Sequence, residues 1–162
     1  FAAEQDAGGL KFGITRIGVH TGSATVGNFG GEKRFNYTAL GDAINTAARL
    51  ESVNKSLGTR VCVSGDTVAE CSTGDFRPVG DLILKGKTVA IGVFEPLSAE
   101  QAAAPQTAAY FEAFDLMKRS PGEALDAFER LVAMYPEDGL ASTHLKRLKA
   151  GEDGVVIRQT EK

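Results

Sequence analysis

Tyr37–Glu51 reads YTALGDAINTAARLE, a turn followed by a segment that predicts a helix with one polar side. Asn45 and Arg49 are four residues apart, so on a helix they lie one turn above the other on the same side. A carboxamide and a guanidinium stacked in this way can hold a ribose oxygen and a phosphate. The spacing alone also fits an ordinary solvated helix face, because polar pairs four residues apart are common.

The segments around this helix predict an α+β fold with a sheet of mixed direction. Residues 14–20 and 60–64 are β-branched runs that predict strands, and residues 76–84 and 89–94 predict a hairpin joined at Lys85-Gly86-Lys87. The helix is expected to begin with Asp42 as its cap and to end near Asn54, before Gly58.

Composition is that of an ordinary soluble globular domain: 162 residues, 43% hydrophobic and 24% charged, with a net charge of −3. This charge gives no electrostatic case for nucleic acid, and no apolar run reaches the length of a membrane span. The cysteines, Cys62 and Cys71, lack metal-ligand spacing and fit a cytoplasmic location. A longer parent could still be membrane-anchored through a region missing here.

The remaining single residues are less informative. His20 ends a predicted strand and is expected to be structural, and His144 is expected on a helix surface. Phe1 stands where an initiator methionine would be, so we expect a cut point there and the tail of an upstream element over residues 1–11.

Beyond the hairpin the composition changes. Residues 98–109 are rich in Ala and Gln and predict a linker, and residues 110–162 predict a helical tail with helices over 110–118, from Pro121 and over 138–149. The apolar spacing and the closing Tyr135-Pro136 resemble a tetratricopeptide helix pair. One pair cannot bury its own face, so we expect it to pack on residues 1–97 or on a partner.

Several separated motifs together carry a resemblance to a known family. They are RIGVHTGS at 16–23, VGNFGG at 26–31, KRFNYT at 33–38, the helix itself, and LKGK at 84–87 followed by VFEP at 93–96. In order and spacing they resemble the second half of a class III nucleotide cyclase catalytic domain, the adenylate/guanylate cyclase family. The resemblance covers about residues 13–97 and implies a partial cyclase domain of ferredoxin-like α+β fold.

The resemblance also implies a reaction, the conversion of ATP to cyclic AMP and pyrophosphate in signal transduction. Asn45 matches the family's asparagine that orients the ribose. Arg49 matches the arginine that stabilises charge on the α-phosphate, and Lys85 matches a lysine that reaches the terminal phosphates. From the sequence alone, Lys85 would be a solvated turn lysine.

Thr38 matches the position at which the family reads the base, and Ala39 could offer its backbone beside it. Family members that use ATP carry Asp or Thr there, whereas guanylate cyclases usually carry Cys or a similar residue. ATP is therefore favoured over GTP. Lys33 and Arg34 precede this position and are candidates for phosphate or dimer contacts, although a surface role fits them equally well.

The family's active site lies between two protomers and uses two divalent ions, Mg²⁺ or Mn²⁺. The two aspartates that hold these ions lie in the first half of the domain, outside this chain, and Asp6 is no substitute for them. We therefore expect the intact parent to be a homodimer, with residues 35–40 in the contact. The chain alone is expected to be inactive.

Two alternatives remain at this point. The chain could belong to a catalytically inactive cyclase-like module that binds nucleotide or regulates a partner, or to an interaction protein built around the helical tail. Intact Asn45, Arg49 and Lys85 argue against the first alternative, and the single helix pair argues against the second.

Overall fold

The chain folds around a five-stranded sheet in a computed structural model that describes residues 13–31 and 34–159. The strand order is β1-β4-β6-β5-β7; β1 pairs parallel to β4 and β7 parallel to β5, whereas the other neighbours are antiparallel. This confirms the predicted α+β fold with a mixed sheet. The strands are β1 (Ile17–Val19), β4 (Val61–Ser64), β5 (Asp75–Ile83), β6 (Ile91–Leu97) and β7 (Val156–Arg158).

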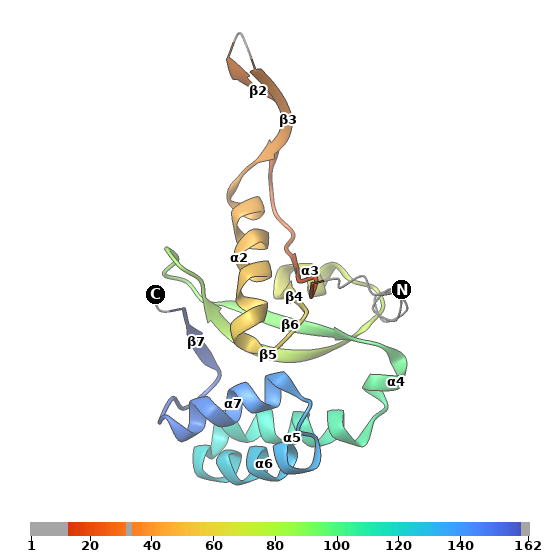
Figure 1. Ribbon diagram of the computed structural model, residues 1–162, viewed down its shortest axis with the longest axis vertical. Helices are drawn as coiled ribbons and strands as arrows, with labels where there is room; N and C mark the ends of the chain where they lie inside the picture. The colour runs from red at the N-terminus through yellow and green to blue at the C-terminus, as the bar shows by residue number, and fades with distance from the viewer. Residues whose placement is uncertain (1–12, 32–33, 160–162) are drawn as a thin grey trace.

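A two-stranded arm extends away from this sheet, as Figure 1 shows. It consists of β2 (Thr25–Gly31) and β3 (Arg34–Leu40), which pair antiparallel from Thr25 opposite Leu40 to Gly31 opposite Arg34. Val26, Tyr37 and Leu40 of the arm are open to solvent in this chain, with Tyr37 76% exposed. Residues 35–40, which were expected in the contact between protomers, therefore belong to one strand of a projecting hairpin.

Helix α2 (Asp42–Leu57) joins the arm to the sheet. Its buried residues recur every three to four positions and include Leu50, Val53 and Leu57, which gives one face to the core. β1 lies against this helix so closely that a Cβ on Gly18 would lie 2.2 Å from the carbonyl oxygen of Ala47. The glycine in the predicted strand therefore permits the contact of helix and strand.

Both ends of α2 differ from the prediction. The N-cap is Gly41, without a side-chain hydrogen bond, and Asp42 lies in the first turn. The helix continues three residues past Asn54, to Leu57. The Asn54 amide points inward and donates to the carbonyl oxygens of Ile17 and Leu50, both at 3.0 Å. It ends at Gly58, whose φ of 73° is the left-handed conformation expected of a glycine stop.

The C-terminal segment is helical from Ala99 onward. Pro105 begins a helix inside the stretch predicted as a linker, and Ser98 with Gln101 forms a capping box for the short helix before it. The predicted start at Pro121 is confirmed, and the helix predicted over 138–149 begins one residue later, at Gly139, with Asp138 as its N-cap. The chain then adds a strand, β7, at one edge of the sheet. The helices are α3 (Gly65–Glu70), α4 (Ala99–Ala102), α5 (Pro105–Arg119), α6 (Pro121–Met134) and α7 (Gly139–Lys149).

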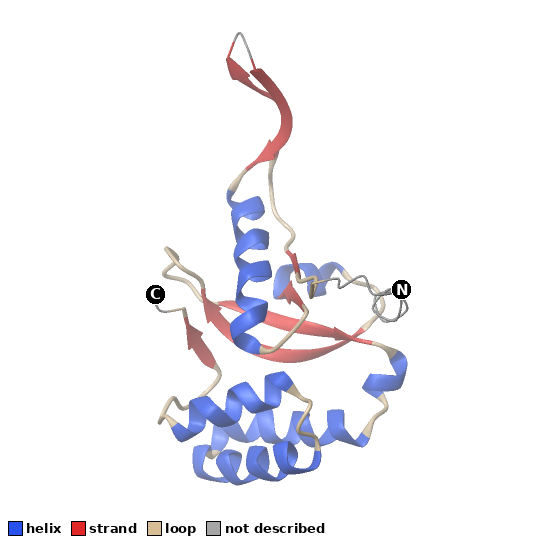
Figure 2. Ribbon diagram, viewed as in Figure 1, coloured by secondary structure: helices blue, strands red, loops and turns tan. Residues whose placement is uncertain are grey.

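The tail shares one hydrophobic core with the sheet. Leu50 of α2, Val79 and Leu82 of β5, Tyr110 of α5 and Phe128 of α6 belong to a single buried cluster. Figure 2 shows α5, α6 and α7 gathered on one side of β5 and β6, with α2 and the arm on the other. The tail therefore packs on its own sheet, one of the two arrangements expected for it.

His144 is inside this core, so its predicted place on a helix surface is wrong. Its exposed fraction is 0%, and its Nε2 lies 3.1 Å from the Tyr110 hydroxyl. Within residues 13–31 and 34–159, no helix has both the length and the apolar character needed to cross a bilayer.

Candidate active site

The polar side of α2 carries Asn45 and Arg49 as the sequence predicted. Asn45 is exposed and Arg49 is half-buried. The Nη1 atom of Arg49 is buried, and no hydrogen-bond partner for it lies among the described residues. Because a buried donor without a partner is costly, this guanidinium is suited to receive an anionic oxygen from outside the chain.

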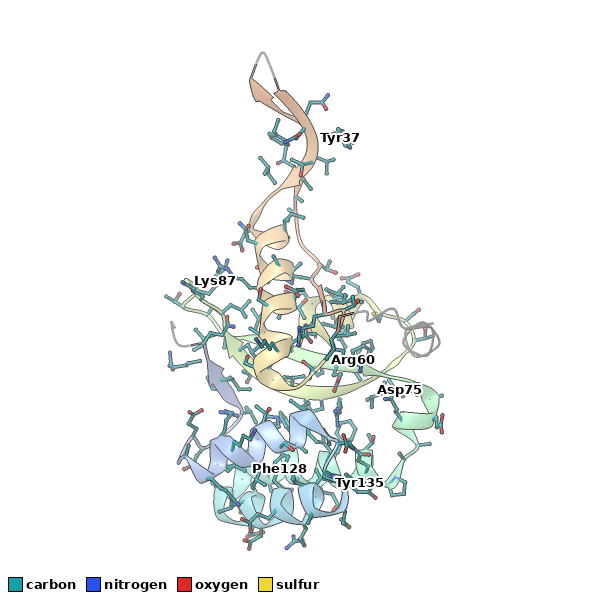
Figure 3. The ribbon with its side chains drawn as sticks, in the orientation of Figure 1. Tyr37, Arg60, Asp75, Lys87, Phe128 and Tyr135 are labelled. Carbon is teal, nitrogen blue, oxygen red and sulfur yellow. The ribbon has the colours of Figure 1, made fainter. Side chains whose placement is uncertain are left out.

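The connection between β5 and β6 lies beside this face of α2. Gly86, in the turn, has a φ of 71°, and a Cβ placed on it would lie 3.8 Å from both Nη1 and Nη2 of Arg49. Lys87 reaches the first turn of the same helix, where its Nζ lies 2.5 Å from each carboxylate oxygen of Asp42. Figure 3 shows Lys87 beside the half of α2 that is nearer the arm.

Lys85 belongs to the same turn. Its side chain is exposed, and its backbone N–H donates to Oε1 of Gln159, just after β7, at 3.3 Å. The fold thus brings Asn45, Arg49 and the turn that bears Lys85 into one region of the surface. Arginine and lysine donors in such an arrangement can bind the oxygens of a polyphosphate.

Three of the other predicted site residues, Arg34, Thr38 and Ala39, lie on the arm. Thr38 pairs with Gly27 and is exposed, and Ala39 pairs with Val26 and is half-buried. The arm extends away from the body of the chain (Figure 1). Thr38 and Ala39 therefore lie away from the polar face of α2, where they could contact another molecule. Arg34 begins β3, and Lys33 lies outside the described residues.

The pKa shifts and hydrogen bonds near α2 and β4 indicate which groups carry charge at this surface and which groups support the fold. The hydrogen bond from Lys87 lowers the pKa of Asp42, which keeps this carboxylate charged beside the turn. Burial raises the pKa of the Cys62 thiol to about 11, so Cys62 is a core residue rather than a nucleophile. His20 donates to or accepts from the Ser64 hydroxyl at 2.8 Å, and Ser64 caps α3, which agrees with the structural role predicted for His20.

Among the described residues, no group of three or more His, Cys, Asp or Glu side chains could hold a metal ion. Asp6 lies outside the described residues. The residues described therefore do not fit the two expected ions.

Sequence reasoning missed two residues of this region, Gly86 and Lys87. Both belong to the LKGK motif, in which the resemblance implies a substrate contact only for Lys85. Lys87 could have been identified through Asp42, the acidic residue in the first turn of α2, because the two side chains carry opposite charges and form an ion pair. Nothing local indicates that these segments meet, because 45 residues separate Asp42 from Lys87.

Together, the mixed sheet, the helix with an unpartnered buried arginine donor and the cationic turn define an α+β domain suited to bind a phosphate ester. Residues 5–95 match the model of the adenylate and guanylate cyclase catalytic domain. Because this match covers more than half of the chain, the chain belongs to that family.

Individual relatives agree with this assignment. The chain is 44% identical over 103 residues to Adenylate cyclase 1 of Rhizobium meliloti (strain 1021), which covers 63% of the chain and 16% of that protein. It is 30% identical over 143 residues to the terminal-differentiation specific adenylate cyclase of Dictyostelium discoideum. This match covers 82% of the chain and 7% of that protein. The chain thus spans less than a fifth of the length of these two relatives.

A solved structure supports the fold as well. The adenylyl cyclase CyaB from P. aeruginosa is similar with a TM-score of 0.51 and 27% sequence identity, over 60% of this chain and 50% of that one. The similarity extends the family assignment from the sequence to the arrangement of the sheet and its helices.

Proposed function

We propose that this chain is part of an adenylate cyclase that converts ATP to cyclic AMP and pyrophosphate. The observation that carries the proposal is the buried, unpartnered Nη1 of Arg49 beside the turn that contains Gly86. The relatives named as adenylate cyclases support the reaction. Thr38 supports ATP rather than GTP, because its hydroxyl can accept from the adenine amino group.

In the proposed reaction, the ribose 3′ hydroxyl loses its proton to water and its oxygen attacks the α-phosphorus. A new O–P bond forms, the bond from the α-phosphorus to the bridging oxygen breaks, and pyrophosphate leaves with the electron pair. Arg49 stabilises the charge that develops on the α-phosphoryl oxygens, and Asn45 orients the ribose. Lys85 binds the terminal phosphates that become the leaving group, and Ala39 lies beside the base reader.

The proposed active site is shared between two protomers. The arm exposes apolar side chains, including Tyr37 and Val26, which is the property of a surface that a second protomer would cover. The metal carboxylates, for Mg²⁺ or Mn²⁺, would come from that second protomer. A site that uses ATP implies the cytoplasm as its location.

The helical tail is proposed to be a structural part of this enzyme rather than a scaffold for other proteins. Three aromatic side chains of the α5–α6 pair, Tyr110, Phe114 and Phe128, are buried in the core shared with the sheet, whereas Phe111 is 42% exposed. The likeness to a tetratricopeptide pair stays a prediction, and the three buried rings are not available to a partner.

The test is cyclic nucleotide formation by the full-length cyclase and by this chain alone, with Mn²⁺ and either ATP or GTP. We expect cyclic AMP from ATP in the full-length enzyme, a loss of about 10²- to 10³-fold in Arg49→Ala, and no product from the chain alone. Arg130→Ala, at an exposed arginine of α6, is the matched control and should keep full activity.

Each other outcome overturns a stated part of the proposal. Cyclic GMP as the product would overturn the role given to Thr38. Product formed by the chain alone would overturn the expectation that the metal carboxylates lie outside this chain. No product from either nucleotide, with the dimer intact, would favour the inactive regulatory module.

A further inference from the structure

The β5–β6 turn is attached to α2 at two levels. Near the start of the helix, Lys87 and Asp42 form an ion pair, which we call the clasp. Two turns further along, Gly86 lies against the guanidinium of Arg49. Residues 42, 45 and 49 share one side of a helix, so Asn45 lies between these two levels.

The clasp is too exposed to contribute much to the stability of the fold. The exposed fractions of the two side chains are 32% for Lys87 and 71% for Asp42. Ion pairs of this kind contribute little to global stability, since water screens both charges. Its effect is therefore local: besides the hydrogen bonds from the Lys87 N–H to the Leu84 carbonyl oxygen at 2.9 Å and from the Lys85 N–H to Gln159, it holds the glycine-containing turn against the helix.

We propose that the Lys87–Asp42 clasp is a positioning pair that sets the distance between Lys85 and Arg49 and so assembles the polyphosphate-binding part of the site. This inference rests on the proposed function, because it assigns the polyphosphate to Lys85 and Arg49. Lys87 and Asp42 act through the turn and touch no reacting atom.

A competing explanation makes the opposite prediction, which is what makes the proposal testable. If Lys87 bound phosphate directly, Asp42 would only neutralise it. The charged groups that act on Asp42 are Lys87, Arg49 and His20, all of them basic, so removing the carboxylate would leave a more positive site. Asp42→Asn would then bind an anion more tightly, whereas loss of positioning makes it bind more weakly.

The experiment measures the binding of inorganic pyrophosphate to this chain by titration calorimetry. We expect Asp42→Asn and Lys87→Gln to weaken binding by about three- to fivefold, and the exchanged pair Asp42→Lys with Lys87→Asp to recover most of the loss. Lys55→Gln, at an exposed lysine near the other end of α2, is the matched control. Unchanged or tighter binding by Asp42→Asn overturns the proposal.

Two further measurements keep the outcome unambiguous. Arg49→Ala tests the proposed function itself: if it binds pyrophosphate as the wild type does, the site assignment fails, and if it loses binding while Asp42→Asn does not, only the clasp fails. Amide hydrogen exchange across residues 84–90 needs no ligand. We expect exchange there to be severalfold faster in Asp42→Asn with an unchanged melting temperature, and equal exchange overturns the clasp even where pyrophosphate binding is absent.

Discussion

His144 is held as a neutral imidazole among aromatic rings. Tyr110 donates its hydroxyl proton to the carbonyl oxygen of Pro78 at 2.7 Å, so the Nε2 of His144, 3.1 Å from that hydroxyl, carries a proton and donates. The Nδ1 atom accepts from Nη1 of Arg147 at 3.4 Å. Burial, the charge of Arg147 and that of Arg77 lower the pKa of His144 to about 3, with Asp138 acting in the opposite direction.

This lowered pKa predicts a loss of stability on mild acidification. In the unfolded chain His144 binds a proton below pH 6.5, whereas in the folded chain it does so only near pH 3, so stability falls as the pH falls through this window. We expect the free energy of unfolding in urea to drop by about 2 kcal/mol between pH 7 and pH 5.

The control is His144→Gln, which keeps an amide donor and removes the titration. Its stability should be nearly constant over the same range. An equal slope in His144→Gln and wild type would contradict the assignment. The spacing of the buried residues Leu140, His144 and Leu148 could have placed this histidine on the inner face of α7, although its polar neighbours predicted a surface.

At the scale of elements, the contact of α2 with α7 depends on two glycines. Gly58 ends α2 with a φ of 73°, and a Cβ placed on it would lie 2.6 Å from the carbonyl carbon and oxygen of Gly139. A Cβ on Gly139 would in turn lie 2.5 Å from the carbonyl oxygen of Gly58. Backbone therefore touches backbone here, and neither partner can move aside as a flexible side chain would.

We expect Gly58→Ala to destabilise the chain by about 2–4 kcal/mol, because it adds the cost of a left-handed alanine to an overpacked contact. Urea unfolding measures the change. The matched control is Gly122→Ala in α6, where an added Cβ meets nothing within 4 Å and alanine is the better helix former. A loss below 1 kcal/mol in Gly58→Ala would mean that the two helices separate easily.

At the scale of the whole molecule, a buried ion-pair cluster joins the sheet to the tail. Arg77 of β5 donates to both carboxylate oxygens of Asp138, at 2.7 and 3.2 Å, and to Glu95 of β6 at 2.8 Å. Asp138 also caps α7 through the backbone N–H of Ala141 and accepts from Gln106. One guanidinium thus connects two strands with the helical tail.

The two carboxylates of the cluster respond differently to burial. Burial acts to raise the pKa of both carboxylates. At Glu95 burial prevails, and the pKa is raised. At Asp138 the hydrogen bonds from Arg77, Ala141 and Gln106 outweigh burial, and the pKa is lowered. The Asp138 contribution to stability is therefore present above its ordinary pKa of 3.8 and is lost as the pH falls through its lowered value.

Removing Arg77 should loosen the whole assembly. We expect Arg77→Met to lower the free energy of urea unfolding by about 3–5 kcal/mol, because Asp138 and Glu95 would remain buried without their counter-charge. Arg77→Met combined with Asp138→Asn should cost clearly less than the sum of the single changes. Arg119→Met, at an arginine whose ion pair with Asp115 is exposed, should cost less than about 1 kcal/mol. Strict additivity would contradict a coupled cluster.

Local patterns in the sequence determined the polar side of α2 with Asn45 and Arg49, the arm, the β5–β6 hairpin and the helix starts at Pro121 and Asp138. These features depend on residues close together in the chain, so periodicity and capping chemistry are enough to predict them. The same local patterns misplaced the start of α2, the start of α5 at Pro105 and the environment of His144. Each of these features depends on what the segment packs against.

Only the tertiary structure decided which segments meet. The clasp joins residues 45 apart, the Arg77–Asp138 pair joins residues 61 apart, and the tail packs into the same core as the sheet. Contacts across such distances are fixed by the burial of apolar surface around them, a property of the whole chain that no local pattern records.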